Sequence, residues 1–151
     1  MPIDDESVFK VINDLVATCY DSHEGFGKAA KGCHSEQLRT FFTEISARRA
    51  EFAGELQTEV SRIGGELTTT GHWGGILHGG WVDLETRIRP KDDLELLENC
   101  EKGEDATRQH YERALAEELP VQSRMVIERQ REDVLGTLEQ IRSLKAQPQE
   151  R

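Results

Sequence analysis

Charged side chains interrupt the apolar face of each predicted helix near its middle, and their types are those that bind metal ions. Five of them fall in one layer of the expected bundle: His23, Glu24, Glu51, Glu104 and Glu132. Carboxylates and imidazoles that project inward from facing helices build the metal sites of helical bundles. The sequence therefore offers a carboxylate-rich site for iron or manganese, with His23 as the only nearby imidazole.

Arginines in the same layer give these carboxylates a second interpretation. Arg48, Arg49, Arg129 and Arg131 could neutralise them in a buried or flanking salt-bridge layer, because an unpaired buried charge is costly. In a milder form of this interpretation, half of the acids are simply solvated at the edge of the buried face. The residues favour these two interpretations over the metal site.

A normal di-iron centre needs residues that the sequence lacks. In such bundles two helices each carry Glu-x-x-His, since residues three apart point the same way and the imidazole completes the coordination. Glu-x-x-His does not occur in this sequence: Gly54 stands three residues after Glu51, and Leu135 stands three after Glu132. Oxygen chemistry at such a centre is therefore disfavoured.

The remaining motifs predict no reaction. GHWGG and HGGW lack the preceding strand and the lysine of a phosphate loop. No Gly-x-Ser-x-Gly elbow is present, and no cysteine lies beside a plausible base and orienter; the adjacent pair Cys33-His34 is expected to be exposed at a helix junction rather than catalytic. We expect His110 on the surface of its helix and Tyr111 in the core with its hydroxyl satisfied. The sequence therefore predicts no catalytic residue and no organic cofactor.

Four long helices are expected to position these side chains. Apolar residues recur three and four positions apart over 5–31, 36–63, 91–118 and 121–145. The predicted buried face of the second helix is Leu38, Phe41, Phe42, Ile45, Phe52, Leu56, Val60 and Ile63. That of the fourth is Val121, Met125, Glu128, Glu132, Leu135, Leu138, Ile141 and Leu144.

The links between the helices predict the topology. Residues 64–80 hold 7 of the 13 glycines, and a short helical arm is expected at 81–89. Only this crossover, 64–90, is long enough to run the length of a bundle, so the two other links must form antiparallel hairpins. We therefore predict a single all-α domain over 1–151, a ferritin-like four-helix bundle. An up-down-up-down bundle with a decorative middle loop is the alternative.

A weak internal repeat agrees with two hairpins. Moving the chain by 81 residues places Cys19 on Cys100 and Glu51 on Glu132, and each matched pair falls on equivalent helices. This pattern suggests duplication of a helical hairpin.

Composition and charge narrow the classes of partner. The 151 residues include 19 basic and 29 acidic ones, a net charge of −10, which disfavours nucleic acid and anionic lipid as partners. No apolar run approaches the roughly 18 residues of a membrane span, and the acidic N-terminus differs from a targeting peptide. Three cysteines without a Cys-x-x-Cys pair suit a reducing compartment. We expect a soluble, cytoplasmic protein.

Several segments together resemble a known family. They are DLVATCYDSHEGFGKAAKG, ARRAEFAGELQTEVSRIGGE, HGGWVDLE and LLENCEKGEDATRQHYERAL, in that order. Over about residues 6–145 the chain is similar to ferritin-like four-helix-bundle proteins of proteobacteria that are catalogued as a domain of unknown function. The resemblance implies the ferritin-like fold and supplies no activity.

Three functions follow as hypotheses. The first is a bundle without its own catalysis that acts through binding or assembly, as a homodimer or with a protein partner. The second is a divergent metal-binding protein or oxidase with the five ligands named above. The third is a stress-linked structural protein whose surface binds a partner helix.

Overall fold

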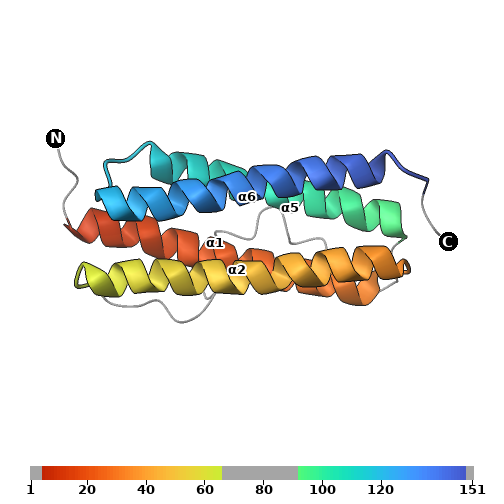
Figure 1. Cartoon of the computed structure of the whole chain (residues 1–151), viewed down its shortest axis with the longest axis horizontal. Helices are drawn as coiled ribbons and strands as arrows, with labels where there is room; N and C mark the ends of the chain where they lie inside the picture. The colour runs from red at the N-terminus through yellow and green to blue at the C-terminus, as the bar shows by residue number, and fades with distance from the viewer. Residues whose placement is uncertain (1–4, 66–91, 149–151) are drawn as a thin grey trace.

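Four long helices make up the part of the chain that the structure, a computed structural model, describes: residues 5–65 and 92–148 (Figure 1). They are α1 (Asp5–Gly32), α2 (Glu36–Arg62), α5 (Asp93–Leu115) and α6 (Val121–Lys145). These two ranges contain no strand. The predicted all-α class is therefore confirmed, and each helix begins and ends within three residues of its expected bounds.

Polar caps define where α2 and α5 begin. The Ser35 side chain accepts a hydrogen bond from the Leu38 amide at 3.2 Å, and Asp92 accepts one from the Glu95 amide at 2.7 Å. Such caps satisfy amide groups that have no partner within the helix. At the other end of α2, Gly64 has φ of +92°, a conformation that glycine adopts without strain.

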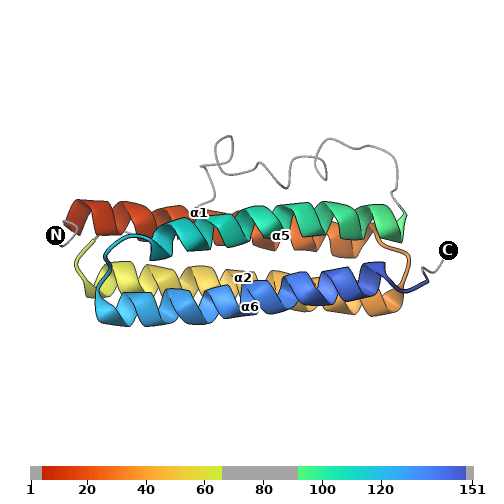
Figure 2. The ribbon, with the colours of Figure 1, turned by 90° about the horizontal axis from the view of Figure 1, so that it is seen from above.

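The helices form two antiparallel hairpins. α1 packs against α2 and α5, and α6 packs against α5 and α2. Figure 2 shows α1 and α5 in one layer and α2 and α6 in the other. α2 ends at the end of the bundle opposite to that where α5 begins (Figure 1). The expected crossover 64–90 and its arm 81–89 lie, apart from Gly64 and Gly65, outside the described residues.

Two apolar clusters fill the interior, one towards each end. The first includes Ile12, Leu15, Leu56 and Ile127, and the second is built around Phe26, Phe42, Leu97 and Ile141. Between them, the middle of the bundle is polar, and the candidate site lies there.

The buried face of α6 differs from the prediction. Its buried residues are Ser123, Ile127, Gln130, Val134, Thr137, Leu138 and Ile141. Val121 and Met125 are 78% and 64% exposed, and Glu128 and Glu132 are exposed too. Leu138 and Ile141 are buried as predicted, but polar side chains with hydrogen-bond partners occupy much of the rest of the buried face, so apolar periodicity placed the first half of that face incorrectly.

Carboxylates join the two hairpins at both ends of the bundle. The Asp93 carboxylate accepts hydrogen bonds from the amides of His34 at 2.7 Å and Ser35 at 3.0 Å. At the other end, Glu59 accepts a hydrogen bond from the Ser123 hydroxyl at 2.8 Å. These contacts fix the two hairpins relative to each other and so hold the central side chains in register.

No helix within residues 5–65 and 92–148 is both long enough and apolar enough to cross a membrane.

Candidate functional site

An ion pair between Arg49 of α2 and Glu104 of α5 occupies the centre of the bundle. Both side chains are 0% exposed. Nη1 of Arg49 donates to Oε1 of Glu104 at 2.7 Å, and Nη2 donates to Oε2 at 2.6 Å. This two-point arrangement matches the planar guanidinium to the planar carboxylate and is the strongest geometry for such a pair.

Each of the other two helices adds a partner to this pair. Ser22 of α1 accepts from Nη1 of Arg49 at 3.0 Å. Thr137 and Asp133 of α6 accept from Nη2 at 3.3 and 3.4 Å. All four helices therefore meet at one guanidinium.

Aromatic rings complete the surroundings of Arg49. Its guanidinium carbon lies 5.8 Å from the ring centre of Phe26 and 5.6 Å from that of Phe52. Aromatic faces attract a cation at such distances. The described residues offer no hydrogen-bond partner to the Arg49 Nε.

Burial and charge act against each other in this pair. Burial lowers the pKa of Arg49, but the charge and hydrogen bonds of Glu104 outweigh it and raise that pKa above its ordinary value. Burial raises the pKa of Glu104, and Arg49 opposes the rise. Because Arg49 stays protonated, the centre carries a permanent cation.

A second polar chain lies next to the ion pair. The Tyr111 hydroxyl donates to Oε1 of Gln130 at 2.6 Å, so the Cys19 thiol, at 3.2 Å, is the donor to the Tyr111 oxygen. The Gln130 amide nitrogen donates to the Phe52 carbonyl at 3.2 Å and to Glu55 at 2.9 Å. Burial raises the pKa of Cys19 to about 11. The expectation that Tyr111 lies in the core with its hydroxyl satisfied is confirmed.

Of the five predicted metal ligands, the structure brings only Glu104 to the centre. Glu24, Glu51 and Glu132 are exposed, and His23 is half-buried, with Nδ1 2.8 Å from the Ser46 carbonyl oxygen. In the part of the chain that the structure describes, no group of three or more His, Cys, Asp or Glu side chains is placed to hold a metal ion. The five residues thus lie apart because three of them are on outward faces of their helices.

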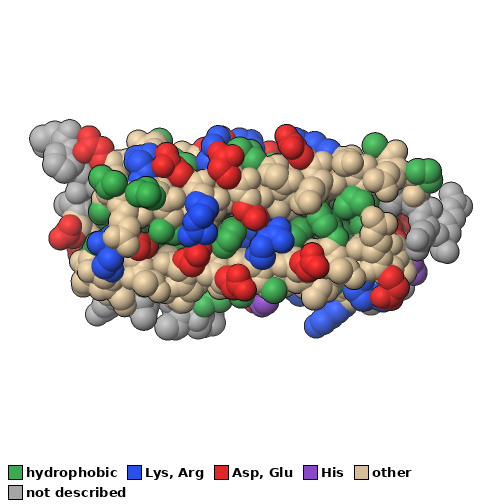
Figure 3. All heavy atoms as spheres, in the orientation of Figure 1, with side chains coloured by type: hydrophobic (Ala, Val, Ile, Leu, Met, Phe, Trp, Pro, Cys, Tyr) green, Lys and Arg blue, Asp and Glu red, His purple; other side chains and the backbone are tan. Residues whose placement is uncertain are grey.

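The four arginines of the salt-bridge interpretation differ in burial. Only Arg49 is buried, whereas Arg48 pairs with Asp133 at 3.3 Å at the surface. Arg129 pairs with Glu55 at 3.0 Å, also at the surface. Figure 3 shows acidic and basic side chains interspersed on the face that α2 and α6 form. A buried pair with a flanking surface layer is therefore present.

The sequence contained a signal for Arg49 that the apolar pattern did not use. The predicted face of α2 runs from Ile45 directly to Phe52, which leaves one turn of the helix without a buried residue. Arg49 stands four residues after Ile45 and three before Phe52, the spacing that continues the face. A polar residue that fills a gap in an apolar stripe is thus a candidate for burial with a partner.

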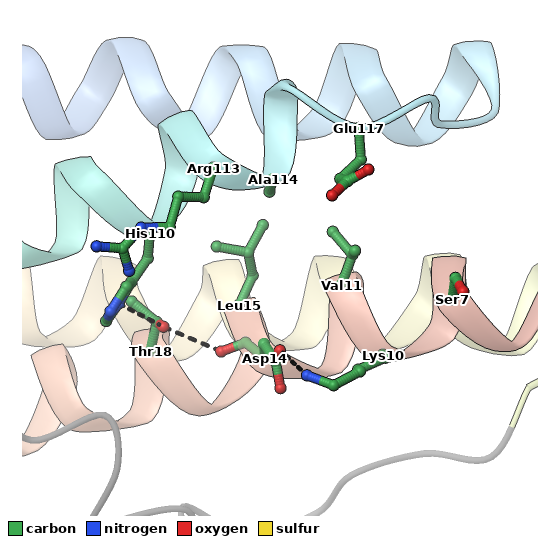
Figure 4. Close-up of a pocket in the computed structure, with 10 residues that line it drawn as sticks. All are labelled: Ser7, Lys10, Val11, Asp14, Leu15, Thr18, His110, Arg113, Ala114 and Glu117. Carbon is green, nitrogen blue, oxygen red and sulfur yellow. Dashed lines mark hydrogen bonds and ion pairs between the residues drawn. The ribbon is translucent and has the colours of Figure 1, made fainter. Parts of the chain in front are cut away.

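A half-open groove between α1 and α5 is the second feature of interest (Figure 4). Its volume is about 560 Å³, and Val11, Leu15 and Ala114 form its apolar part. His110 lines it and is half-buried, with its Nδ1 3.1 Å from the Thr18 hydroxyl. His110 thus lies at the surface of its helix as expected, but it is half-buried because α1 covers one side of the ring.

Comparison with known proteins assigns the chain to a family. No curated protein matches it significantly. A family model described as a domain of unknown function, DUF2383, matches residues 7–117. That match takes in α1, α2 and α5, including both partners of the central ion pair, and covers more than half of the chain, which therefore belongs to this family of unknown function.

Proposed function

We propose that the protein is a ferritin-like helical bundle that acts through binding or assembly, without catalysis of its own. The observation that carries this proposal is the Arg49–Glu104 pair, buried completely at the place where related architectures hold metal ions. The separation of the α2 end from the α5 start supports the ferritin-like crossover, because residues 66–91 must then connect opposite ends (Figure 1).

The central pair supports a metal-free bundle for two physical reasons. Both oxygens of Glu104 already accept hydrogen bonds from Arg49, so a metal ion would have to break two charge-assisted bonds. The guanidinium also stays positively charged at every pH at which the protein folds. A divalent cation placed beside it would be repelled in a medium of low polarity.

Binding of iron or manganese by Glu24, Glu51, Glu104, Glu132 and His23 stays the competing hypothesis. The measurement that decides between the two is the metal content after anaerobic loading with ferrous or manganous ions and desalting. We expect less than about a tenth of an equivalent in the wild type and in two matched variants, Glu104→Gln and Glu132→Gln. Stoichiometric metal that disappears in Glu104→Gln would overturn the proposal and establish the metal site.

Assembly, in its simplest form a homodimer, is supported by the start of α6. Val121 and Met125 lie one helical turn apart there and are the most exposed large apolar side chains of the described residues. Sedimentation velocity over the micromolar range tests this form of the proposal. A protein that dimerises, and whose Val121→Gln/Met125→Gln variant does not, supports it; a strict monomer leaves ligand binding as the proposed function.

A further inference from the structure

The groove between α1 and α5 contains a histidine whose hydrogen bonding can be assigned. The Thr18 hydroxyl donates its single proton to the Asp14 carbonyl oxygen at 2.9 Å. Its contact of 3.1 Å with His110 therefore has Nδ1–H of the ring as donor and the Thr18 oxygen as acceptor. In the neutral ring, Nε2 is then an acceptor, and protonation would make it a second donor.

One of the two cations that line the groove near His110 is not paired with a carboxylate. Lys10 is paired with Asp14 at 2.9 Å. Arg113 has no carboxylate partner in the described ranges, and Figure 4 shows its side chain turned toward His110 and away from Glu117. Burial lowers the pKa of His110, and the charge of Arg113 lowers it further, against a smaller opposing effect of Asp14. The His110 end of the groove is therefore positive although the protein is acidic.

An apolar strip adjoins this positive end. In Figure 4, Leu15 and Ala114 lie between the His110 and Glu117 ends of the groove, and Val11 lies across from Glu117. Six residues of α1 line the groove, and from the first, Ser7, to the last, Thr18, the helix rises about 16 Å at 1.5 Å per residue. A groove of this length, with three apolar side chains along it and the guanidinium of Arg113 at one end, fits an elongated ligand with a hydrocarbon body and one charged group.

We propose that this groove binds a small monocarboxylate with a hydrocarbon body. Arg113 binds the carboxylate, since a guanidinium presents two parallel N–H groups to its two oxygens. The hydrocarbon covers Val11, Leu15 and Ala114. A dianion such as a phosphate ester is less suited, because the net charge of −10 opposes it and the groove has one unpaired cation to offer.

Ligand binding should also change the titration of His110. The charges that act on the ring are Arg113 from α5 and Asp14 from α1, and the other charged groups of the groove are Lys10, which pairs with Asp14, and Glu117, at the opposite end. A carboxylate bound at Arg113 offsets the cation that disfavours protonation of the ring. The pKa of His110 is therefore expected to rise on binding, which its imidazole NMR signals report directly.

The inference rests on the proposed binding function, and a titration with octanoate tests it. We expect one equivalent to bind saturably to the wild-type protein, and 1-octanol and octylamine, which keep the hydrocarbon but lack the carboxylate, to bind at least about tenfold more weakly. Arg113→Gln should weaken octanoate binding by roughly tenfold and abolish the rise in the His110 pKa. The control Arg129→Gln, an exposed arginine of α6, should leave both unchanged.

The possible failures of this experiment are distinct. Absence of saturable octanoate binding, equal binding to Arg113→Gln and wild type, or preference for octylamine would each overturn the carboxylate site. The metal content described above is independent of these titrations. Stoichiometric metal would overturn the proposed function whether or not octanoate binds. A protein that contains no metal and does not bind octanoate would refute only the proposed ligand of the groove.

Discussion

Replacing Glu104 by glutamine should destabilise the protein strongly, and a metal ion should not alter the loss. Glu104→Gln keeps the shape of the side chain but leaves the buried guanidinium of Arg49 without its main counter-charge. The partners that remain are the hydroxyls of Ser22 and Thr137 and the more distant carboxylate of Asp133. Breaking a fully buried pair from one side typically costs about 3–5 kcal/mol, a large part of the stability of a domain.

A second substitution should restore part of that loss. In Arg49→Met/Glu104→Gln neither a cation nor an anion is buried, so the double variant should be more stable than either single variant. The hydroxyls of Ser22 and Thr137 lose their donor in it, at a cost of about 1 kcal/mol each. The interaction energy from this double-mutant cycle should therefore reach several kcal/mol.

The pH dependence of the stability of the Arg49→Met variant tests the direction in which the pKa of Glu104 shifts when Arg49 is lost. Without Arg49, the pKa of the buried Glu104 lies further above its ordinary value, because the charge that most strongly opposed the effect of burial is gone and only the weaker effect of Arg48 still lowers that pKa. A carboxyl group with a raised pKa in the folded state contributes stability at low pH that is lost as pH rises through that pKa. Arg49→Met should therefore be less destabilised at pH 5 than at pH 8, whereas Glu104→Gln, which has no carboxyl group to protonate at this position, should not be.

Urea unfolding followed by helical circular dichroism measures all of these free energies. The series is run with chelator and again with added manganese, with Glu132→Gln as a matched control, since Glu132 is 72% exposed on its side chain. The control should change stability by less than about 0.5 kcal/mol. The reasoning would be refuted if the stability losses of the two single variants simply add in the double variant. It would also be refuted if Glu104→Gln loses less than about 1 kcal/mol of stability, or loses stability only when metal is present.

Three further predictions concern the ends and the thiols of the bundle. Burial raises the pKa of Glu59, but hydrogen bonds from Arg62 and Ser123 outweigh this effect and leave the pKa below 4.5. The wild-type protein should therefore lose stability as the pH falls below that value. The Glu59→Gln variant should be about 1.5 kcal/mol less stable than the wild type at pH 7 and should lose less free energy of unfolding as the pH falls. Asp93→Ala should lower the free energy of unfolding by about 2 kcal/mol and speed the hydrogen exchange of amides at the start of α2, which NMR measures. Unchanged exchange at these amides would contradict the link that Asp93 forms between the hairpins. All three cysteines are buried. At pH 8, a thiol reagent should therefore react rapidly with none of them in the folded protein and with all three after unfolding. One rapidly reacting thiol in the folded protein would show that a cysteine is accessible.

Helix positions could be predicted from the sequence because each helix needs only local information. Apolar spacing defines the length of a helix, and Ser35 and the pair Gly64-Gly65 mark the boundaries of α2. The buried face of α1 was largely predictable: of the apolar-spaced positions Val8, Ile12, Leu15, Val16, Cys19, His23, Phe26 and Ala30, all but the half-buried His23 are buried. In these helices the apolar pattern and the packing agree.

The face of α6 and the identity of the central pair depend on partners from other helices. Gln130 and Thr137 look like surface residues in the sequence, yet both are buried because Tyr111 and Arg49 supply their hydrogen bonds. The spacing from Ile45 and Phe52 selects Arg49 rather than Arg48 for burial, but the register between α2 and α5 determines which carboxylate Arg49 meets. Composition and local spacing do not contain that register.

An arginine at the centre has a consequence that a metal ion would not have. A metal can be loaded, exchanged or reduced, whereas the guanidinium of Arg49 is covalently part of α2 and keeps its charge. The centre therefore stabilises one arrangement of all four helices through Ser22, Glu104 and Thr137. Any ligand that the protein binds is therefore expected to lie outside this fixed core. The groove at His110 lies along α1 and α5 on the side of the bundle. A ligand can bind there without disturbing the central pair.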